Sequence, residues 1–468
     1  MRTEHDALGS LQVPADCLHG IHTARASSHF RIAGRPVAAD LIHAYGAVKM
    51  ACCRINARLG HLDQTTAGAI EAACEEMRAG ALDAHIVVDA LQGGAGTSLN
   101  MNINEVLANR ALQILGHAPG AYAHCDPLEQ VNRHQSTNDT FPTALRVAAM
   151  QVLKRLEQGC IALLEACQDR ERALAAVVCV GRTQLQDAVL LTLGRQFGAY
   201  ADALARDRWR VHKCEERLRV VNLGGTAVGT GLGAPRQFIF QVVDELRAIT
   251  GLPLARAENL VDATANQDAL VEVAGVMNAL ATTLIKMAGD LRLLASGPAG
   301  GFGEIVLPAR QAGSSIMPDK INPVIPEAVQ QAGMRSIAAQ QCIAQAVAAG
   351  SLQINPFLPL VADELLGSLD QLDRACRMLA EHCVAGIASV PERCAANVAG
   401  STALLTALVD RVGYHQASEW AAQAQQEGRP VREVVLDSGR ISAPDLAACT
   451  SPEAVNRLGS LPPREDQP

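Results

Sequence analysis

Residues 270–294 read LVEVAGVMNALATTLIKMAGDLRLL, and the apolar side chains in this stretch recur at intervals that alternate strictly between three and four. The positions of this heptad seam are Leu270, Val273, Met277, Leu280, Leu284, Met287, Leu291 and Leu294. The spacing predicts a single α-helix about 40 Å long, at a rise of about 1.5 Å per residue. A helix this long with an apolar stripe needs other long helices beside it, so the stretch predicts a helical bundle.

Composition and periodicity along the rest of the chain also favour helices. Of the 468 residues, 49% are hydrophobic but only 3% are aromatic, so we expect a core of Ala, Leu, Val and Ile, which suits close-packed helices. Helical periodicity dominates, and alternating strand patterns are nearly absent. Further long helices are expected at 142–176, 187–220, 326–350 and 362–389. Glycine and proline gather in segments that we expect to be loops or bundle ends, at 223–235, 251–253 and 297–326.

The expected fold is therefore all-α, with a central bundle of long helices flanked by two smaller helical domains. The length of the chain suggests three domains. We expect an N-terminal helical domain over residues 1–138, the long-helix bundle over 139–393 and a small C-terminal domain over 394–468. The bundle can pack within one chain or across subunits, and a seam this regular favours an oligomer.

Charge, cysteine usage and hydropathy argue against several classes of protein. A formal net charge of −8, without a Lys/Arg-rich block, argues against a nucleic-acid partner. The fourteen cysteines include no C-x-x-C pair and the first residues lack a signal-peptide profile, so we expect a reduced, cytoplasmic protein. Residues 336–362 are uncharged, but their Gln, Gly and Pro content is too high for a membrane span. The thirteen histidines have no metal-ligand spacing, so no metal is expected.

Three segments rich in small hydroxyl and amide side chains stand at the starts of predicted helices. They are residues 93–98 (GGAGTS), 135–139 (QSTND) and 181–187 (GRTQLQD). Helix capping explains part of each segment, because Ser, Thr, Asn and Asp are preferred caps. Each segment nevertheless holds more hydroxyls and amides than a cap needs, and a helix N-terminus with neutral donors binds carboxylates well. Three such termini and one lysine would suit a small dicarboxylate.

A fourth segment, residues 313–327 (GSSIMPDKINPVIPE), places two serines, Lys320 and Asn322 on a loop. Glycines from Gly297 to Gly313 make this region mobile, and Pro318 and Pro323 stiffen it locally. A bare Gly-Ser-Ser would be interpreted as a linker with incidental polar residues. A mobile loop that carries a potential base and a cation is typical of an active-site lid.

Residues 224–233 (GGTAVGTGLG) are also rich in glycine. They lack the residue order of a phosphate-binding loop, and no strand is expected before them. We interpret them as a tight loop between helices. The chain contains no G-x-S-x-G nucleophile elbow either.

In this order and spacing, the four polar segments resemble those of the aspartase/fumarase superfamily. The resemblance extends over nearly the whole chain, from residues 13–16 (VPAD) to 431–436 (VREVVL). Three local choices resemble the ammonia-lyase branch rather than the fumarases: GGAGTS at 93–98, His22 where fumarases tend to have Gln, and Gln184 where fumarases use His. The resemblance implies a carbon–nitrogen lyase that reversibly deaminates L-aspartate to fumarate and ammonia. It also implies a homotetramer without a cofactor, in which each active site is assembled from three subunits.

The resemblance implies a role for each polar side chain. Ser314, on the mobile loop, would be the base that removes the C3 proton and produces an aci-carboxylate intermediate. The hydroxyls suited to the β-carboxylate are those of Thr97, Ser98, Ser136, Thr137 and Ser315. The groups suited to the α-carboxylate are those of Lys320, Asn322 and Thr183. The side chains expected to face the leaving amino group are those of Asn138 and Gln184.

The chain departs from the family pattern at three places. Asp319 stands where the family usually has Gly or Ala, His134 stands where small residues are commoner, and residues 407–410 read ALVD instead of a sequence close to ALNP. The carboxylate of Asp319 would repel a dianionic substrate, pair with a neighbouring cation or point to solvent.

Three other functions stay open. They are a fumarase on the same scaffold, a lyase for a substituted aspartate, and a non-catalytic structural protein. The intact serine, lysine and asparagine of the 313–327 segment argue against the last of these.

Overall fold

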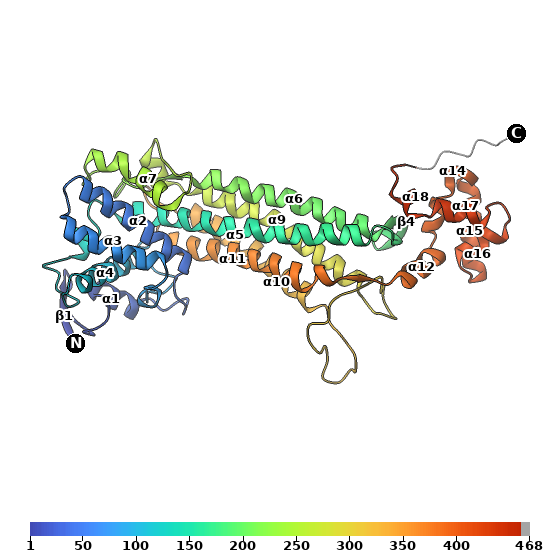
Figure 1. Cartoon of the computed structure of the whole chain (residues 1–468), viewed down its shortest axis with the longest axis horizontal. Helices are drawn as coiled ribbons and strands as arrows, with labels where there is room; N and C mark the ends of the chain where they lie inside the picture. Colours follow the sequence, from blue (N-terminus) through green and yellow to red (C-terminus); the bar gives the residue numbers. More distant parts are fainter. Residues whose placement is uncertain (460–468) are drawn as a thin grey trace. The chain divides into compact units, whose positions relative to one another are not determined.

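The computed structural model describes residues 1–459 as eighteen α-helices, α1–α18, and four two-stranded β-sheets (Figure 1). Five helices have 25 residues or more, namely α5 (Thr137–Ala173), α6 (Leu193–Leu218), α9 (Asp268–Leu294), α10 (Val324–Ala348) and α11 (Leu358–His382). The strands have only two to seven residues. The predicted all-α fold class is therefore confirmed.

The heptad seam lies along α9, and its side chains are buried. From Leu270 to Leu291, each of the seven seam residues is at most 2% exposed, and Leu294 in the last turn is half-buried. Within residues 1–459, α9 is also the one helix whose length and apolarity would let it cross a membrane, properties that the core helix of a bundle shares. The helix predicted for 270–294 is confirmed.

The chain divides into two compact units. The first unit contains residues 1–157, 209–281 and 334–373, and the second contains 158–208, 282–333 and 374 onward. The predicted domain boundaries at 138 and 393 stay a prediction, and the last residues of the expected 394–468 domain, 460–468, lie outside the described residues.

In the first unit, polar contacts join each long helix to the next along the chain. The pairs are Lys154–Glu215 between α5 and α6, Arg217–Glu272 between α6 and α9, Asn278–Gln340 between α9 and α10, and Ser336–Ser368 between α10 and α11. The helices thus pack as consecutive neighbours, as the seam on α9 requires.

Shorter helices of the first unit pack around α2. They are α1 (Ile21–His29), α2 (Ala39–Arg58), α3 (Gln64–Arg78), α4 (Thr97–Ile114) and α7 (Arg236–Thr250). Helix α2 contacts α3 and α7, and α3 contacts α4. The buried carboxylate of Glu105 in α4 accepts the backbone N–H groups of Gly20, His22 and Thr23, which fixes the start of α1. Several of the remaining short elements are β1 (Arg2–Asp6), β2 (Gly9–Val13), a π-helix (Pro127–Val131), β5 (Val220–Val221), β6 (Ala255–Arg256) and α8 (Leu260–Ala265).

One predicted helix was wrong at its start. Residues 187–192 were expected to be helical, but they belong to β4 (Gln186–Thr192), which pairs with β3 (Val178–Thr183), and the helix begins only at Leu193. The two strands are joined by Gln184 and Leu185, both with positive φ, at 54° and 63°. Because this tight turn contains no Gly or Asn, the sequence carried no signal for a hairpin. The helix expected at 362–389 also ends early, at His382.

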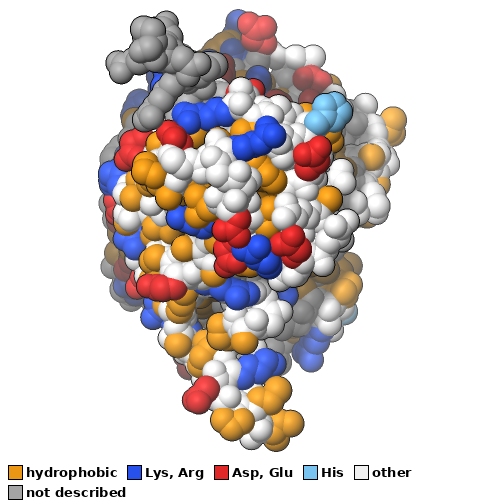
Figure 2. All heavy atoms as spheres, turned by 90° about the vertical axis from the view of Figure 1, so that its right-hand side faces the viewer, with side chains coloured by type: hydrophobic (Ala, Val, Ile, Leu, Met, Phe, Trp, Pro, Cys, Tyr) orange, Lys and Arg blue, Asp and Glu red, His pale blue; other side chains and the backbone are white. Residues whose placement is uncertain are grey.

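Short helices at the C-terminal end of the chain form a separate core within the second unit. They are α12 (Pro391–Gly400), α13 (Ala403–Thr406), α14 (Val409–Val412), α15 (Tyr414–Glu427), α16 (Val431–Asp437), α17 (Ala443–Cys449) and α18 (Pro452–Asn456). Their core contains Trp420, Val435 and Leu446, each at most 2% exposed. Strands β7 (Ile305–Val306) and β8 (Ala388–Ser389) form the last small sheet. On the face shown in Figure 2, acidic and basic side chains are intermingled rather than gathered by sign.

Candidate functional site

The starts of α4 and α5 bring two of the predicted polar segments together. Thr97 and Ser98 form the first turn of α4, which follows Gly96. Gly96 has a φ of 92°, and a Cβ added to it would lie 2.1 Å from the ring of Phe141 in α5. Only glycine allows this approach, so the N-terminus of α4 packs directly against the first turn of α5.

Two predicted hydroxyl groups at the start of α5, those of Ser136 and Thr137, accept hydrogen bonds from other groups of the protein. The side-chain amide of Asn100 in α4 donates to Thr137 Oγ1 at 3.1 Å, and the backbone N–H of Asn138 donates to Ser136 Oγ at 3.2 Å. Since both oxygens accept, their own protons are left to donate to a carboxylate. Thr97 differs, because its hydroxyl donates to the carbonyl of Gly94 at 2.7 Å.

A buried lysine, Lys49, lies close to these hydroxyl groups, and the sequence did not indicate a role for it. Lys49 Nζ is fully buried and donates to Asn132 Oδ1 at 3.0 Å and to Gln135 Oε1 at 2.9 Å. Burial lowers the pKa of Lys49 to about 8. Asn132 Oδ1 also accepts from Asn100, the residue that donates to Thr137, so the lysine is linked to a predicted site hydroxyl. The only sequence signal was one charged residue in an apolar stretch of α2.

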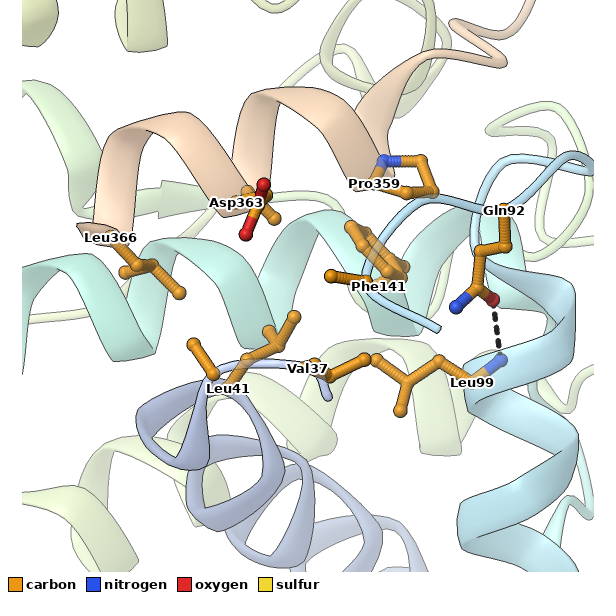
Figure 3. Close-up of a pocket in the computed structure, with 11 residues that line it drawn as sticks. Val37, Leu41, Gln92, Leu99, Phe141, Pro359, Asp363 and Leu366 are labelled. Atoms are coloured by element: carbon orange, nitrogen blue, oxygen red, sulfur yellow. Dashed lines mark hydrogen bonds between the residues drawn. The ribbon is translucent and has the colours of Figure 1, made fainter. Parts of the chain in front are cut away.

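An apolar gap lies beside the same helix starts (Figure 3). Phe141 faces Val37 and Leu41 across it, and the backbone N–H of Leu99 in α4 is capped by Gln92 Oε1 at 2.8 Å. The gap has a volume of about 10 Å³, which leaves room for at most one water. It is therefore a feature of helix packing rather than a substrate pocket.

In the second unit, Thr183 and Gln184 stand at the turn between β3 and β4. Thr183 pairs with Gln186 across the hairpin, and Gln184 and Leu185 form the turn with left-handed backbone conformations. The side chains at this tip are exposed. Below them, Arg182 is held by the carboxylate of Glu304, which is fully buried, through hydrogen bonds of 3.0 and 2.8 Å. The end of β3 beside the turn is thus fixed, while the side chains of the turn itself are exposed.

The loop 313–322 carries the other four predicted residues of this unit, Ser314, Ser315, Lys320 and Asn322. The loop projects from the chain segment between α9 and α10, and no helix or strand covers it (Figure 1). Its two ends meet, because Asn322 Nδ2 donates to the carbonyl of Gly313 at 2.7 Å and a Cβ at Gly313 would lie 1.9 Å from Lys320 O. Apolar side chains on the loop are exposed, Ile316 by 84% and Ile321 by 50%.

Ser314 has a specific environment within this loop. Its Oγ accepts the backbone N–H groups of Ile316 at 3.2 Å and Met317 at 3.0 Å. Two N–H donors on one hydroxyl oxygen stabilise negative charge on that oxygen. The nearby departure from the family pattern, Asp319, has a φ of 58°, a conformation that Asp tolerates better than most residues.

The predicted site residues thus fall into two sets. Thr97, Ser98, Ser136, Thr137 and Asn138 lie in the first unit, and the hairpin turn and loop 313–322 lie in the second. Within residues 1–459, no hydrogen bond joins the turn at 183–184 to the loop at 313–322. The same described part of the chain contains no group of three or more His, Cys, Asp or Glu side chains that could hold a metal ion.

Comparison with known proteins identifies the family. A model described as "Lyase" matches residues 9–338, and one described as "Fumarase C C-terminus" matches residues 404–456. The aspartate ammonia-lyase of Pseudomonas aeruginosa is 43% identical over 97% of this chain and 96% of its own length. A fumarate lyase:delta crystallin from Brucella melitensis superposes with a TM-score of 0.92 at 43% identity, over 97% of this chain and 99% of that one. A class II fumarase from Schistosoma mansoni has a TM-score of 0.90 at 29% identity, with the same coverage.

These matches cover both units, and they confirm the predicted carbon–nitrogen lyase class. The chain therefore belongs to the lyase family of the aspartase/fumarase superfamily.

Proposed function

We propose that this chain catalyses the reversible deamination of L-aspartate to fumarate and ammonia. The observation that carries the proposal is the 43% identity to an aspartate ammonia-lyase over 97% of the chain, against 29% to a fumarase of the same fold. The choice of Gln184 at the hairpin turn supports it, because the resemblance associates His at this position with fumarases.

Ser314 is the proposed base. The C3 proton of aspartate is weakly acidic, and a neutral hydroxyl is too weak a base to remove it. Ser314 must therefore react as an alkoxide, whose negative charge the N–H groups of Ile316 and Met317 would stabilise. Lys320, on the same loop, adds positive charge.

The remaining polar side chains are proposed to stabilise the intermediate. When Ser314 takes the C3 proton, the electron pair of the C–H bond delocalises into the β-carboxylate and gives a dianionic aci-carboxylate. The protons of Ser136 and Thr137, which their observed contacts leave free, are suited to this group. When the intermediate collapses, the delocalised electron pair forms the C2–C3 double bond, and the nitrogen leaves as ammonia with the electrons of the C2–N bond. Asn138 and Gln184 are proposed to face this nitrogen.

We also propose a cytoplasmic homotetramer in which each site combines side chains of three subunits. The proposal rests on the resemblance to the superfamily and on the exposed position of the hairpin turn and of loop 313–322. In such an assembly, the Thr97, Ser98 and Ser136–Asn138 group of one subunit would meet the turn and the loop of others.

Fumarase is the second candidate, because the S. mansoni fumarase shares the fold at a TM-score of 0.90. It would use the same aci-carboxylate but add water instead of ammonia. Gln184 disfavours it, since glutamine cannot exchange a proton with water as histidine does.

The test is to follow the ultraviolet absorbance of fumarate after the purified protein is mixed with L-aspartate, with L-malate in a parallel reaction. The Ser314→Ala variant, purified from the same host, controls for contaminating enzymes. Fumarate from aspartate alone, absent with the variant, is the expected result. Fumarate from malate alone would establish the fumarase, and no fumarate from either substrate would leave the substituted-aspartate lyase or the structural protein.

A further inference from the structure

The glycine-rich segment at residues 222–232, here named the glycine loop, contacts the residue proposed to face the amino group. We propose that the glycine loop determines specificity for the amino group, by holding the side chain of Asn138 so that its oxygen faces the substrate. This inference rests on the proposed aspartate ammonia-lyase function. It gives the loop a role that its sequence, without the order of a phosphate-binding motif, did not suggest.

The orientation of the Asn138 amide follows from one contact. Asn138 Nδ2 lies 2.7 Å from the carbonyl oxygen of Ala227. A carbonyl can only accept, so the NH₂ end of the amide must point to Ala227 and the oxygen must point away from it. Within residues 1–459, Asn138 Oδ1 accepts no hydrogen bond, and the residue is only half-buried. A reachable acceptor is therefore left for a ligand.

The glycine loop is anchored to the residue that follows Asn138. The carboxylate of Asp139 is fully buried and accepts the backbone N–H groups of Gly224 at 3.1 Å and Thr226 at 2.9 Å. Its other oxygen accepts the N–H of Ser136 at 3.0 Å. The same carboxylate thus fixes both the loop and the predicted substrate segment.

A second anchor comes from the beginning of the loop. Asn222 Nδ2 donates to the backbone carbonyl of Asn138 at 3.0 Å and also to Thr264 Oγ1 at 2.9 Å. The glycines also let the loop pack closely against α8, since a Cβ at Gly229 would lie 2.3 Å from the backbone nitrogen of Val261. With contacts on both sides of Ala227, its carbonyl is held at a defined position beside Asn138.

The orientation of the Asn138 amide affects the binding of the substrate's amino group more than the binding of its carboxylates. An ammonium group only donates hydrogen bonds, so it is bound by Asn138 Oδ1 and would be repelled by the NH₂ end of the same side chain. A hydroxyl group can donate or accept, so its binding depends less on which end is presented. If the glycine loop no longer held Asn138, the side-chain amide could rotate and present its NH₂ end to the substrate. This would weaken the binding of the amine while the carboxylate contacts remain.

The test compares Gly224, in the glycine loop, with Gly233, which follows the loop and has nearly the same φ. Gly224 has a φ of 91° and Gly233 a φ of 92°, and a φ in this range disfavours alanine at both positions. At Gly224, the new Cβ would lie 3.1 Å from Ile239 Cα, and the N–H is one of those bound by Asp139. At Gly233, nothing lies within 4 Å of the new Cβ. Gly233→Ala is thus the matched control for Gly224→Ala.

The measurement is the amination of fumarate, with separate KM values for ammonia and for fumarate. In Gly224→Ala, the KM for ammonia should rise about tenfold, the loss expected for one hydrogen bond, while the KM for fumarate changes by less than about twofold. Gly233→Ala should leave both values within about twofold of wild type. If Gly224→Ala does not fold, Thr226→Gly replaces it, because it removes the hydroxyl contacts of Thr226 with Gly225 and Leu232 but keeps the backbone N–H bound by Asp139.

The possible failures are distinguishable. A wild-type protein that forms neither fumarate from aspartate nor aspartate from fumarate and ammonia overturns the proposed function, and this inference with it. An active wild type whose Gly224→Ala and Gly233→Ala variants have the same ratio of the two KM values overturns the inference alone. So does a folded Thr226→Gly variant with wild-type KM values, where that variant carries the test.

Discussion

The hydroxyl oxygen of Ser314 accepts the backbone N–H of Met317, three residues further along the same loop, at 3.0 Å. The N–H of Ile316 reaches the same oxygen at 3.2 Å. Both donors come from the loop that carries the serine, so the environment of the proposed base is built locally. Such donors stabilise an ionised oxygen more than they stabilise a neutral hydroxyl.

Replacing Ser314 by Ala should lower kcat by at least about a thousandfold, because the proposed base is removed, while the KM for aspartate changes only a few-fold. Ser315→Ala provides the comparison, since its hydroxyl is assigned to carboxylate binding and its loss should raise KM more than it lowers kcat. Steady-state kinetics with L-aspartate decide the matter. A Ser314→Ala enzyme with near-normal turnover would rule out this serine as the base.

Replacing Asp319 by Gly should lower the KM for aspartate a few-fold, because a carboxylate beside Lys320 repels a dianionic substrate. Asp319→Asn separates charge from conformation, since Asn also tolerates the observed φ of 58°. Both variants should lower KM, and the difference from wild type should shrink as salt is added. An unchanged KM in Asp319→Asn with a lowered KM in Asp319→Gly would show that the backbone, and not the charge, is responsible.

His134 should make the protein less stable in acid. Its Nδ1 donates to Asn56 Oδ1 at 2.6 Å, because the amide nitrogen of Asn56 is already directed at the carbonyl of Arg133. Burial, with smaller contributions from His61 and Arg133, lowers the pKa of His134 from 6.5 to about 4. Between these values the unfolded chain binds a proton that the folded chain does not, so stability falls as the pH decreases from 6.5 to 4.

The variant that tests this is His134→Asn, because Asn tolerates the positive φ of 60° at this position. Melting temperatures measured between pH 7 and pH 4.5 should fall more steeply for the wild type than for the variant. Parallel curves for the two proteins would contradict the assignment.

Glu304→Ala should destabilise the second unit by about 3–5 kcal/mol, because it leaves the cation of Arg182 without its buried partner. The carboxylate of Glu304 also accepts from Asn397 of α12 at 2.9 Å, so it joins the turn end of β3 to α12. Glu433→Ala is the matched control, since Glu433 pairs with Arg429 on the surface and such pairs contribute about 0–1 kcal/mol. Urea unfolding gives both values, and equal losses would contradict a structural role for Glu304.

Much of the fold was predictable because helical periodicity is a local property. The seam from Leu270 to Leu291 needed only the spacing of apolar residues, and all seven positions are buried in α9. The β3–β4 hairpin was missed for a physical reason. Its turn at Gln184 and Leu185 adopts left-handed conformations that neighbouring contacts must maintain, and no turn-forming residue marks it.

The candidate site, like the fold, could be predicted from the sequence only in part. The motifs that hold Ser136, Asn138 and Ser314 could be recognised because each is a short run of residues at a helix start or on a loop. Neither the link from Lys49 through Asn132 to Asn100 nor the contact of Asn138 with Ala227 could be predicted. These partners are separated by tens of residues, and no periodicity relates them.

The sequence by itself determined the helical bundle, the family and the chemical type of the proposed site, because these depend on spacing and residue type. Only the tertiary structure decided that Asp139 holds the glycine loop and the substrate segment together. The physical reason is that a hydrogen bond requires a distance and a direction. For distant residues, both are fixed only when the helices that carry them have packed.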